Sequence, residues 1–156
     1  MSICVHVEKK FVAATLSELK QVGARRSECV VLWLGKRSAD AINIVQVMRP
    51  AQVVGRAYFN IPESSMDSLM KHLRTERLMI AAQVHSHPKK AFHSAADDKW
   101  AIVRHVGALS LVVPFFAQRT ETESFIDDTA VFSLSAEDEW VEVPKDNLND
   151  VLKILP

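Results

Sequence analysis

The chain has 156 residues, 48% of them hydrophobic, and its 19 basic and 19 acidic residues give no formal net charge. This length favours a single domain over residues 1–156, long enough to bury a sizeable core. A neutral chain has no general attraction to nucleic acid or to anionic membranes. With no signal-peptide pattern, no bilayer-length apolar run and only two cysteines, the protein is expected to be cytoplasmic.

The first part of the chain predicts a helix followed by a β-hairpin. Apolar residues recur at three-to-four spacing over residues 8–24, which is the helical period. Residues 29–34 form a continuous apolar run of strand length, typical of a buried strand. A turn over residues 35–40 then leads to a hairpin partner over residues 41–48.

The middle of the chain predicts helices alternating with strands. Residues 50–61 are irregular, with a short strand at 56–60, and Pro62 is well placed to start a helix. Residues 78–85 form the next strand. A helix over residues 94–105 follows, stopped by Gly107.

The last part of the chain predicts mainly β-structure. Residues 108–113 form a strand ended by Pro114, residues 119–129 form an exposed polar loop, and residues 130–134 and 140–143 form a hairpin. A short helix is expected over residues 146–152. Strands mixed with about three helices indicate the α/β class.

Two histidines and an aspartate make residues 84–97 the most informative segment. Side chains alternate along a strand, so His85 and His87 point to the same face and can share one metal ion. Asp97, at the start of the expected helix, can add a carboxylate. Three such ligands suit a catalytic zinc, which keeps its fourth position for water, although the ligand types do not exclude iron or manganese. Ser94 and Asp97 also fit a helix N-cap, a role compatible with a site at the same place.

The order His-x-His-Pro, a short loop and Ser-x-x-Asp over residues 85–97 resembles the motif of the JAMM (also MPN+ or JAB) metallopeptidases. The loop is one residue shorter than in many members. The family also has a glutamate that opens an apolar strand ending in glycine, and Glu28 in residues 26–35 matches it. By itself, Glu28 would be taken for a solvent-facing charge. The resemblance covers residues 10–135 and implies an MPN/JAMM-like domain with a central mixed sheet flanked by helices.

The resemblance assigns a role to each motif residue. His85, His87 and Asp97 would hold one zinc ion per chain, and Glu28 would act as the general base. Ser94 would donate a hydrogen bond to the substrate oxygen on which charge develops.

Residues 92–98 and 106–114 resemble the compact bacterial branch of this family, some of whose members resemble deubiquitinases. These occur in operons with E1-like and E2-like proteins, including anti-phage systems. The resemblance therefore implies a zinc-dependent isopeptidase or peptidase that cleaves after the tail of a ubiquitin-like protein. Its partners would be that protein, its conjugates and the E1-like and E2-like proteins, with no nucleic acid and no membrane. The loop after Pro114 has no Cys or His, so it lacks the second zinc site of the linkage-specific eukaryotic members.

Two alternatives stay open: a catalytically silent MPN scaffold for protein assembly, and a nucleic-acid-associated member, which the neutral charge disfavours. The zincin, deaminase and Gly-rich phosphate-loop motifs are absent from the sequence. Residues around the motif have competing interpretations. His93 and Asp98 are either partners of the ligands or solvent-exposed, Lys89 and Lys90 meet either an acidic substrate or solvent, and Cys29 is expected to be inert packing.

Overall fold

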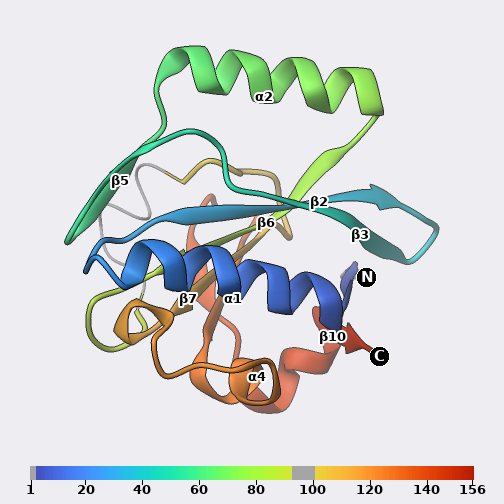
Figure 1. Cartoon of the computed structure of the whole chain (residues 1–156). Helices are drawn as coiled ribbons and strands as arrows, with labels where there is room; N and C mark the ends of the chain where they lie inside the picture. Colours follow the sequence, from blue (N-terminus) through green and yellow to red (C-terminus); the bar gives the residue numbers. More distant parts are fainter. Residues whose placement is uncertain (1–2, 93–100) are drawn as a thin grey trace.

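The structure, a computed structural model, describes residues 3–92 and 101–156. Its main element is an eight-stranded sheet with strand order β10-β1-β3-β2-β6-β7-β8-β9 (Figure 1). β1 is parallel to both its neighbours and β6 is parallel to β7, whereas the other pairs are antiparallel. The predicted mixed sheet and α/β class are therefore confirmed. The strands are β1 (Cys4–Glu8), β2 (Val30–Arg37), β3 (Ala41–Met48), β6 (Met79–Ser86), β7 (Leu109–Val113), β8 (Ala130–Leu134), β9 (Trp140–Glu142) and β10 (Leu152–Leu155).

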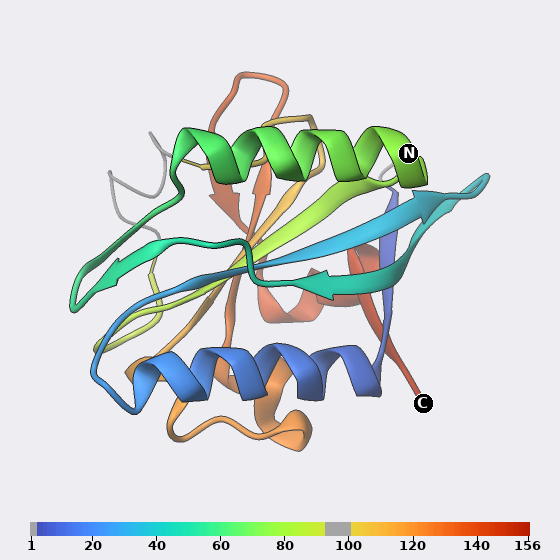
Figure 2. The ribbon, with the colours of Figure 1, turned by 45° about the horizontal axis from the view of Figure 1, so that its top comes forward.

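Helices cover both faces of this sheet. In Figures 1 and 2, α2 lies on one face, and α1 and α4 lie on the other. A separate two-stranded sheet, β4 and β5, connects β3 to α2. None of the helices in the described part of the chain is long and apolar enough to cross a membrane. The remaining elements are α1 (Lys9–Gly23), β4 (Val53–Gly55), β5 (Tyr58–Asn60), α2 (Glu63–Glu76), η1 (Phe115–Ala117), η2 (Thr122–Ser124), α4 (Phe125–Asp128) and η3 (Lys145–Asp150).

The central strand β2 is buried on both sides because it separates two clusters of apolar side chains. Val30, Leu32 and Leu34 pack in the cluster under α2, whereas Val31 and Trp33 pack in the cluster under α1. This alternation follows from the two-residue period of a strand. The predicted apolar run of residues 29–34 is thus a central strand, as expected for a run without polar positions.

The two long helices differ in how much of their surface they bury. α1 buries an apolar stripe at the predicted three-to-four spacing, and the indole of Trp33 donates a 2.8 Å hydrogen bond to the Thr15 hydroxyl on that helix. α2 buries only Leu69 almost completely, and Met70, the next residue of this helix, is 39% exposed. α2 therefore covers its face of the sheet less tightly than α1 does.

Two strands of the eight-stranded sheet, β1 and β10, were not predicted. β1 occupies residues directly before α1, so the helix begins at Lys9, and β10 begins at Leu152, inside the region predicted as helix. The rest of that region, η3, is a 3₁₀ helix rather than an α-helix. β2 also continues to Arg37, into the expected turn. β1 and β10 pair with each other, and β1 continues into α1 without an intervening residue.

Two further expectations were wrong in the second half of the chain. The predicted helix over residues 94–105 begins outside the described residues, and its described end, residues 101–105, is not helical. There the Ile102 amide donates to the buried side chain of Gln83 at 2.8 Å, so a tertiary contact replaces a helical hydrogen bond. The predicted exposed loop over residues 119–129 contains η2 and α4, and it buries Thr120 and Phe125 completely.

Candidate active site

The two motif histidines lie side by side at the end of β6. This strand is hydrogen-bonded on both sides, with His85 opposite Val30 of β2 and Val112 of β7. His85 is fully buried and His87 is 4% exposed, and their ring centroids are 5.0 Å apart. The predicted arrangement of the two imidazoles on one side of the strand is therefore present in the structure.

Glu28 lies just before β2, the strand that pairs with the histidine-bearing strand β6. It is 5% exposed, and it lies two residues before Val30, the register partner of His85. Its backbone N–H donates a 2.8 Å hydrogen bond to the carbonyl of Gly55, which fixes the start of β2 against β4. Glu28 is thus a buried carboxyl group next to the histidines, not a charge at a solvated strand edge.

A cavity of about 920 Å³ connects these groups, because Glu28 and His87 both line it. The β5 hairpin and α2 provide an apolar wall that includes Phe59, Ile61 and Met66. The ring of Phe59 lies 5.9 Å from that of His85, measured between centroids. The cavity is large enough for several atoms of a polypeptide substrate beside the histidines and the carboxylate.

Cys29 and Ser86 bind the two strands together beneath the site. The Cys29 amide donates to the Ser86 hydroxyl, and the Ser86 amide donates to the Cys29 carbonyl, both at 3.3 Å. The Cys29 side chain is fully buried, and burial raises the pKa of its thiol to about 12. A thiol that stays protonated at neutral pH is a poor nucleophile, which supports the expected packing role.

The loop after β6 is held by a left-handed turn that the sequence did not reveal. Phe115, Phe116 and Ala117 all have φ between 53° and 61°, although none is glycine. The Phe116 amide donates a 2.7 Å hydrogen bond to the carbonyl of His87, and the Phe115 amide donates to the carbonyl of Lys89 at 2.9 Å. Left-handed backbone costs roughly 1–2 kcal/mol at each non-glycine residue. Because these amides fix the chain around His87, the strain is located where it positions a candidate ligand.

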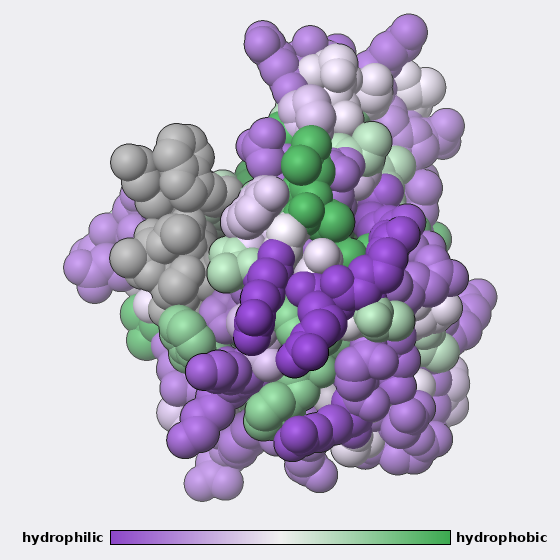
Figure 3. Space-filling model, turned by 60° about the vertical axis from the view of Figure 1, so that its left-hand side comes forward, coloured by the Kyte–Doolittle hydropathy of each residue, from purple (hydrophilic) through white to green (hydrophobic). Residues whose placement is uncertain are grey.

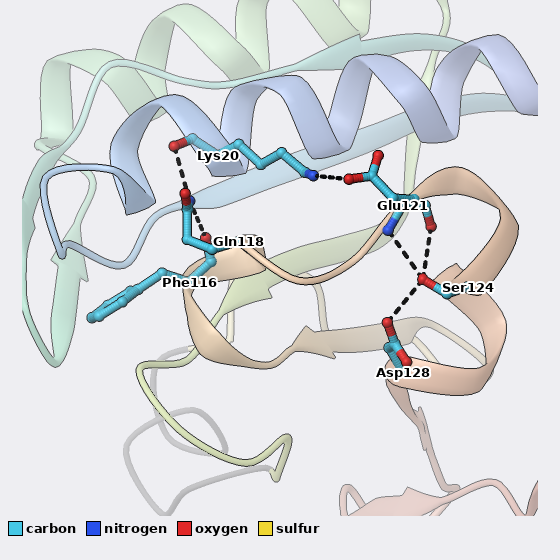
Figure 4. Close-up of polar contacts among 6 residues, drawn as sticks. All are labelled: Lys20, Phe116, Gln118, Glu121, Ser124 and Asp128. Carbon is cyan, nitrogen blue, oxygen red and sulfur yellow. Dashed lines mark hydrogen bonds and ion pairs between the residues drawn. The ribbon is translucent and has the colours of Figure 1, made fainter.

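The α1 helix supports this turn from behind (Figure 4). The Gln118 side-chain amide donates to the Lys20 carbonyl at 3.2 Å and to the Phe116 carbonyl at 3.0 Å. Lys20 also forms a 2.8 Å ion pair with Glu121. The end of α1, η1 and the His87 loop are therefore one hydrogen-bonded unit.

Three of the five predicted site residues meet in the described part of the chain: Glu28, His85 and His87. The other two, Ser94 and Asp97, lie outside the described residues, as do His93 and Asp98. Within residues 3–92 and 101–156, no group of three or more His, Cys, Asp or Glu side chains is arranged to hold a metal ion. The ring nitrogens of two adjacent buried histidines are suitable metal ligands. A catalytic zinc site would need a third ligand from the protein in addition.

Phe59 and Phe92 are neighbours of the histidines that sequence reasoning missed. The rings of Phe92 and His87 make a T-shaped contact at a centroid distance of 4.6 Å. Phe59 belongs to β5, which the sequence indicated only as a weak strand. Neither aromatic residue carries a motif, so only the register of β5 and the course of the loop reveal them.

The described residues thus combine an α/β fold with two adjacent buried histidines and a buried carboxyl group beside a cavity. No family model matches the chain. The sequence is 31% identical over 154 residues to "Probable metalloprotease y4jG" of Sinorhizobium fredii, and the alignment covers 96% of the chain and 93% of that relative. The chain therefore belongs to the metalloprotease family of that protein.

A solved structure supports the fold. The solution structure of protein DSY2949 from Desulfitobacterium hafniense matches with a TM-score of 0.70, covering 97% of this chain and 92% of that one. The sequence identity is 17%, so this similarity concerns the fold alone.

Proposed function

We propose that residues 1–156 form one JAMM (MPN+) domain and that the protein is a zinc-dependent isopeptidase or peptidase. The observation that carries the proposal is that Glu28 lines the same cavity as His87, whose ring lies 5.0 Å from that of His85, although Glu28 is 57 positions from His85 in the chain. Membership of a metalloprotease family supports a metal-dependent peptidase.

In this proposal His85, His87 and Asp97 hold one zinc ion per chain. The ion supplies a Lewis acid that activates water and polarises the carbonyl of the scissile bond. Glu28 accepts a proton from the attacking water at its carboxylate and returns it to the leaving amine. Ser94 donates a hydrogen bond to the oxygen on which negative charge develops.

The proposed substrate is the extended C-terminal tail of a ubiquitin-like protein, or a conjugate of it, with E1-like and E2-like proteins as candidate operon partners. β5 provides one wall of the cavity and pairs only with β4 among the described strands, which leaves its other edge open for strand addition. Small residues next to the scissile bond would let the tail approach the metal.

The test uses a ubiquitin-like protein encoded beside this protein, fused through its tail to a reporter. We expect cleavage directly after the tail, inhibition by a zinc chelator, and one zinc per chain by elemental analysis. Equal cleavage of unrelated unfolded peptides would contradict the ubiquitin-like substrate. A protein that binds no transition metal even when zinc is supplied would favour the silent scaffold.

A further inference from the structure

Six basic side chains lie on segments that adjoin residues lining the cavity. The loop after α1, the β4–β5 turn, the loop after β6 and the segment after η1 all lie at one end of the molecule (Figures 1 and 2). Each of these segments carries at least one cation, and each cation is exposed: Arg25, Arg26, Arg56, Lys89, Lys90 and Arg119.

The contacts of these segments place the cations near the site. Arg25 and Arg26 precede Glu28 by two or three residues, and Arg56 follows Gly55, which accepts the Glu28 amide. Lys89 lines the cavity itself. Arg119 stacks on the ring of Phe115 at 4.0 Å, and the Phe115 amide donates to the Lys89 carbonyl.

None of the six cations forms an ion pair within the part of the chain that the structure describes. The ion pairs found there involve other residues: Lys10–Glu8, Lys20–Glu121, Arg49–Glu18 and Arg104–Asp138. Among the acids nearest in the chain, Glu28 is buried, Glu121 pairs with Lys20, and Asp97 and Asp98 lie outside the described residues. The positive charge at the mouth is therefore available to a partner.

The acidic residues that balance this charge are concentrated elsewhere in the chain. Residues 121–156 contain ten Asp or Glu residues and only two lysines, out of 19 acidic and 19 basic residues in total. The protein is neutral as a whole, but its charge is distributed unevenly. A local excess of exposed positive charge beside the cavity guides an oppositely charged partner there and increases its association rate.

Exposed apolar side chains on the same face favour a polypeptide as the partner. Tyr58 and Phe92, which line the cavity, are 56% and 53% exposed. Figure 3 shows hydrophobic groups in the middle of this face with strongly hydrophilic side chains beside them. Aromatic residues and arginines together are typical of protein interfaces. A polyanion bound through its phosphates would need the cations but not the apolar groups.

We propose that this site selects polypeptides with acidic side chains close to the scissile bond. This inference rests on the proposed peptidase function and adds a substrate class to it. The six cations bind and orient the acidic residues that flank the scissile bond. The apolar wall from β5 and α2 contacts the segment of substrate that enters the cavity.

The test uses three internally quenched peptides with the same glycine-containing scissile segment, flanked by glutamate, glutamine or lysine. At low ionic strength the zinc-loaded protein should cleave the glutamate peptide with a kcat/KM about tenfold above that of the glutamine peptide, and the lysine peptide should be the poorest. The difference should lie mainly in KM and should shrink as salt is added, because the Debye length falls to about 10 Å at 0.1 M.

Two double variants locate the effect. Arg56→Glu with Lys90→Glu should lower the ratio of kcat/KM for the glutamate peptide to that for the glutamine peptide about tenfold. Lys36→Glu with Arg37→Glu reverses two exposed cations at the far end of β2 and changes the net charge equally. This control should leave all three peptides unaffected. Identical behaviour of the two double variants would overturn the proposal, as would equal cleavage of the glutamate and glutamine peptides.

A binding measurement separates this inference from the peptidase proposal. If no peptide is cleaved, the peptidase function fails, and fluorescence anisotropy of the labelled glutamate and glutamine peptides then decides the inference. Tighter binding of the glutamate peptide, reduced by Arg56→Glu with Lys90→Glu, would support it, and equal binding would overturn it. The labelled glutamate peptide can also be displaced by single-stranded oligothymidylate or by unlabelled glutamate peptide. Displacement at a lower concentration of the oligothymidylate would show a nucleic-acid surface and would also overturn the inference.

Discussion

Replacing Gly23 by alanine should disturb the site from the far side of the left-handed turn. A Cβ at this position would overlap the backbone carbonyl oxygen of Phe116 and lie 2.8 Å from the Phe116 Cβ, whereas real Cβ contacts essentially never fall below 3.0 Å. The obstacle is backbone, so it cannot rotate away. α1 and η1 would have to separate, and η1 holds the carbonyl of His87 through the Phe116 amide.

The expected loss of stability combines two opposing effects. Overpacking typically costs about 1–3 kcal/mol, and a clash with backbone should fall at the upper end. Alanine stabilises a helix by up to about 1 kcal/mol relative to glycine, which offsets part of this. The net loss should be about 2 kcal/mol, or roughly 4–8 °C in Tm for a chain of this size. Displacement of His87 should also weaken zinc binding by about tenfold.

The assay measures Tm and zinc affinity for Gly23→Ala and for a control, Gly107→Ala. At Gly107 an added Cβ meets nothing within 4 Å, but φ is +86°, so the substitution costs about 1 kcal/mol of backbone strain far from η1. The control should lose stability and keep its zinc affinity. An unchanged Tm for Gly23→Ala, or a zinc affinity equal to that of Gly107→Ala, would refute the reasoning.

Three other predictions concern the site residues. Glu28→Gln should keep the fold and the bound zinc but lower kcat about 10²–10⁴-fold, and loss of zinc in elemental analysis would show that Glu28 is a ligand instead. His85→Ala should lose both zinc and activity, and a chelator should lower the Tm of the wild type but not that of the variant, because only the wild type has metal binding energy to lose. Burial raises the pKa of the Cys29 thiol from 9.0 to about 12. At a pH between these two values the thiol is deprotonated in the unfolded chain but stays protonated in the folded protein. Stability should therefore fall as pH rises above about 9, and urea midpoints at pH 8 and pH 10 should show a smaller fall for Cys29→Ala; an identical fall would contradict the assignment.

The elements that could be predicted from sequence are those with long, regular patterns. α1 repeats its apolar positions over four turns, and the hairpin partner β3 was predicted with the observed bounds. β1 also has a regular pattern, with Val5 and Val7 buried, but it spans only five residues and continues directly into α1. The non-helical course of residues 101–105 depends on the side-chain oxygen of Gln83, which accepts a hydrogen bond from the Ile102 amide. Local sequence does not reveal this tertiary partner.

The site shows a similar division. The spacing of His85 and His87 on one strand is enough to place their rings together, because strand geometry is local. Glu28 required the family resemblance, since only the β2–β6 register brings it near the histidines. The left-handed η1 turn contains no glycine, so no residue type marked it, and Phe59 reaches the site only through the β4–β5 hairpin.

The pairing of β1 with β10 has a consequence for the order in which the protein is made. Val5 pairs with Leu152, so the two partners are separated by 152 − 5 = 147 residues. At about 5–20 residues per second, the ribosome needs roughly 7–30 s to synthesise the intervening chain. During that interval β1 can pair with β3, but its other edge is open to strands of other chains. The nascent protein should therefore depend on chaperones most strongly until β10 emerges.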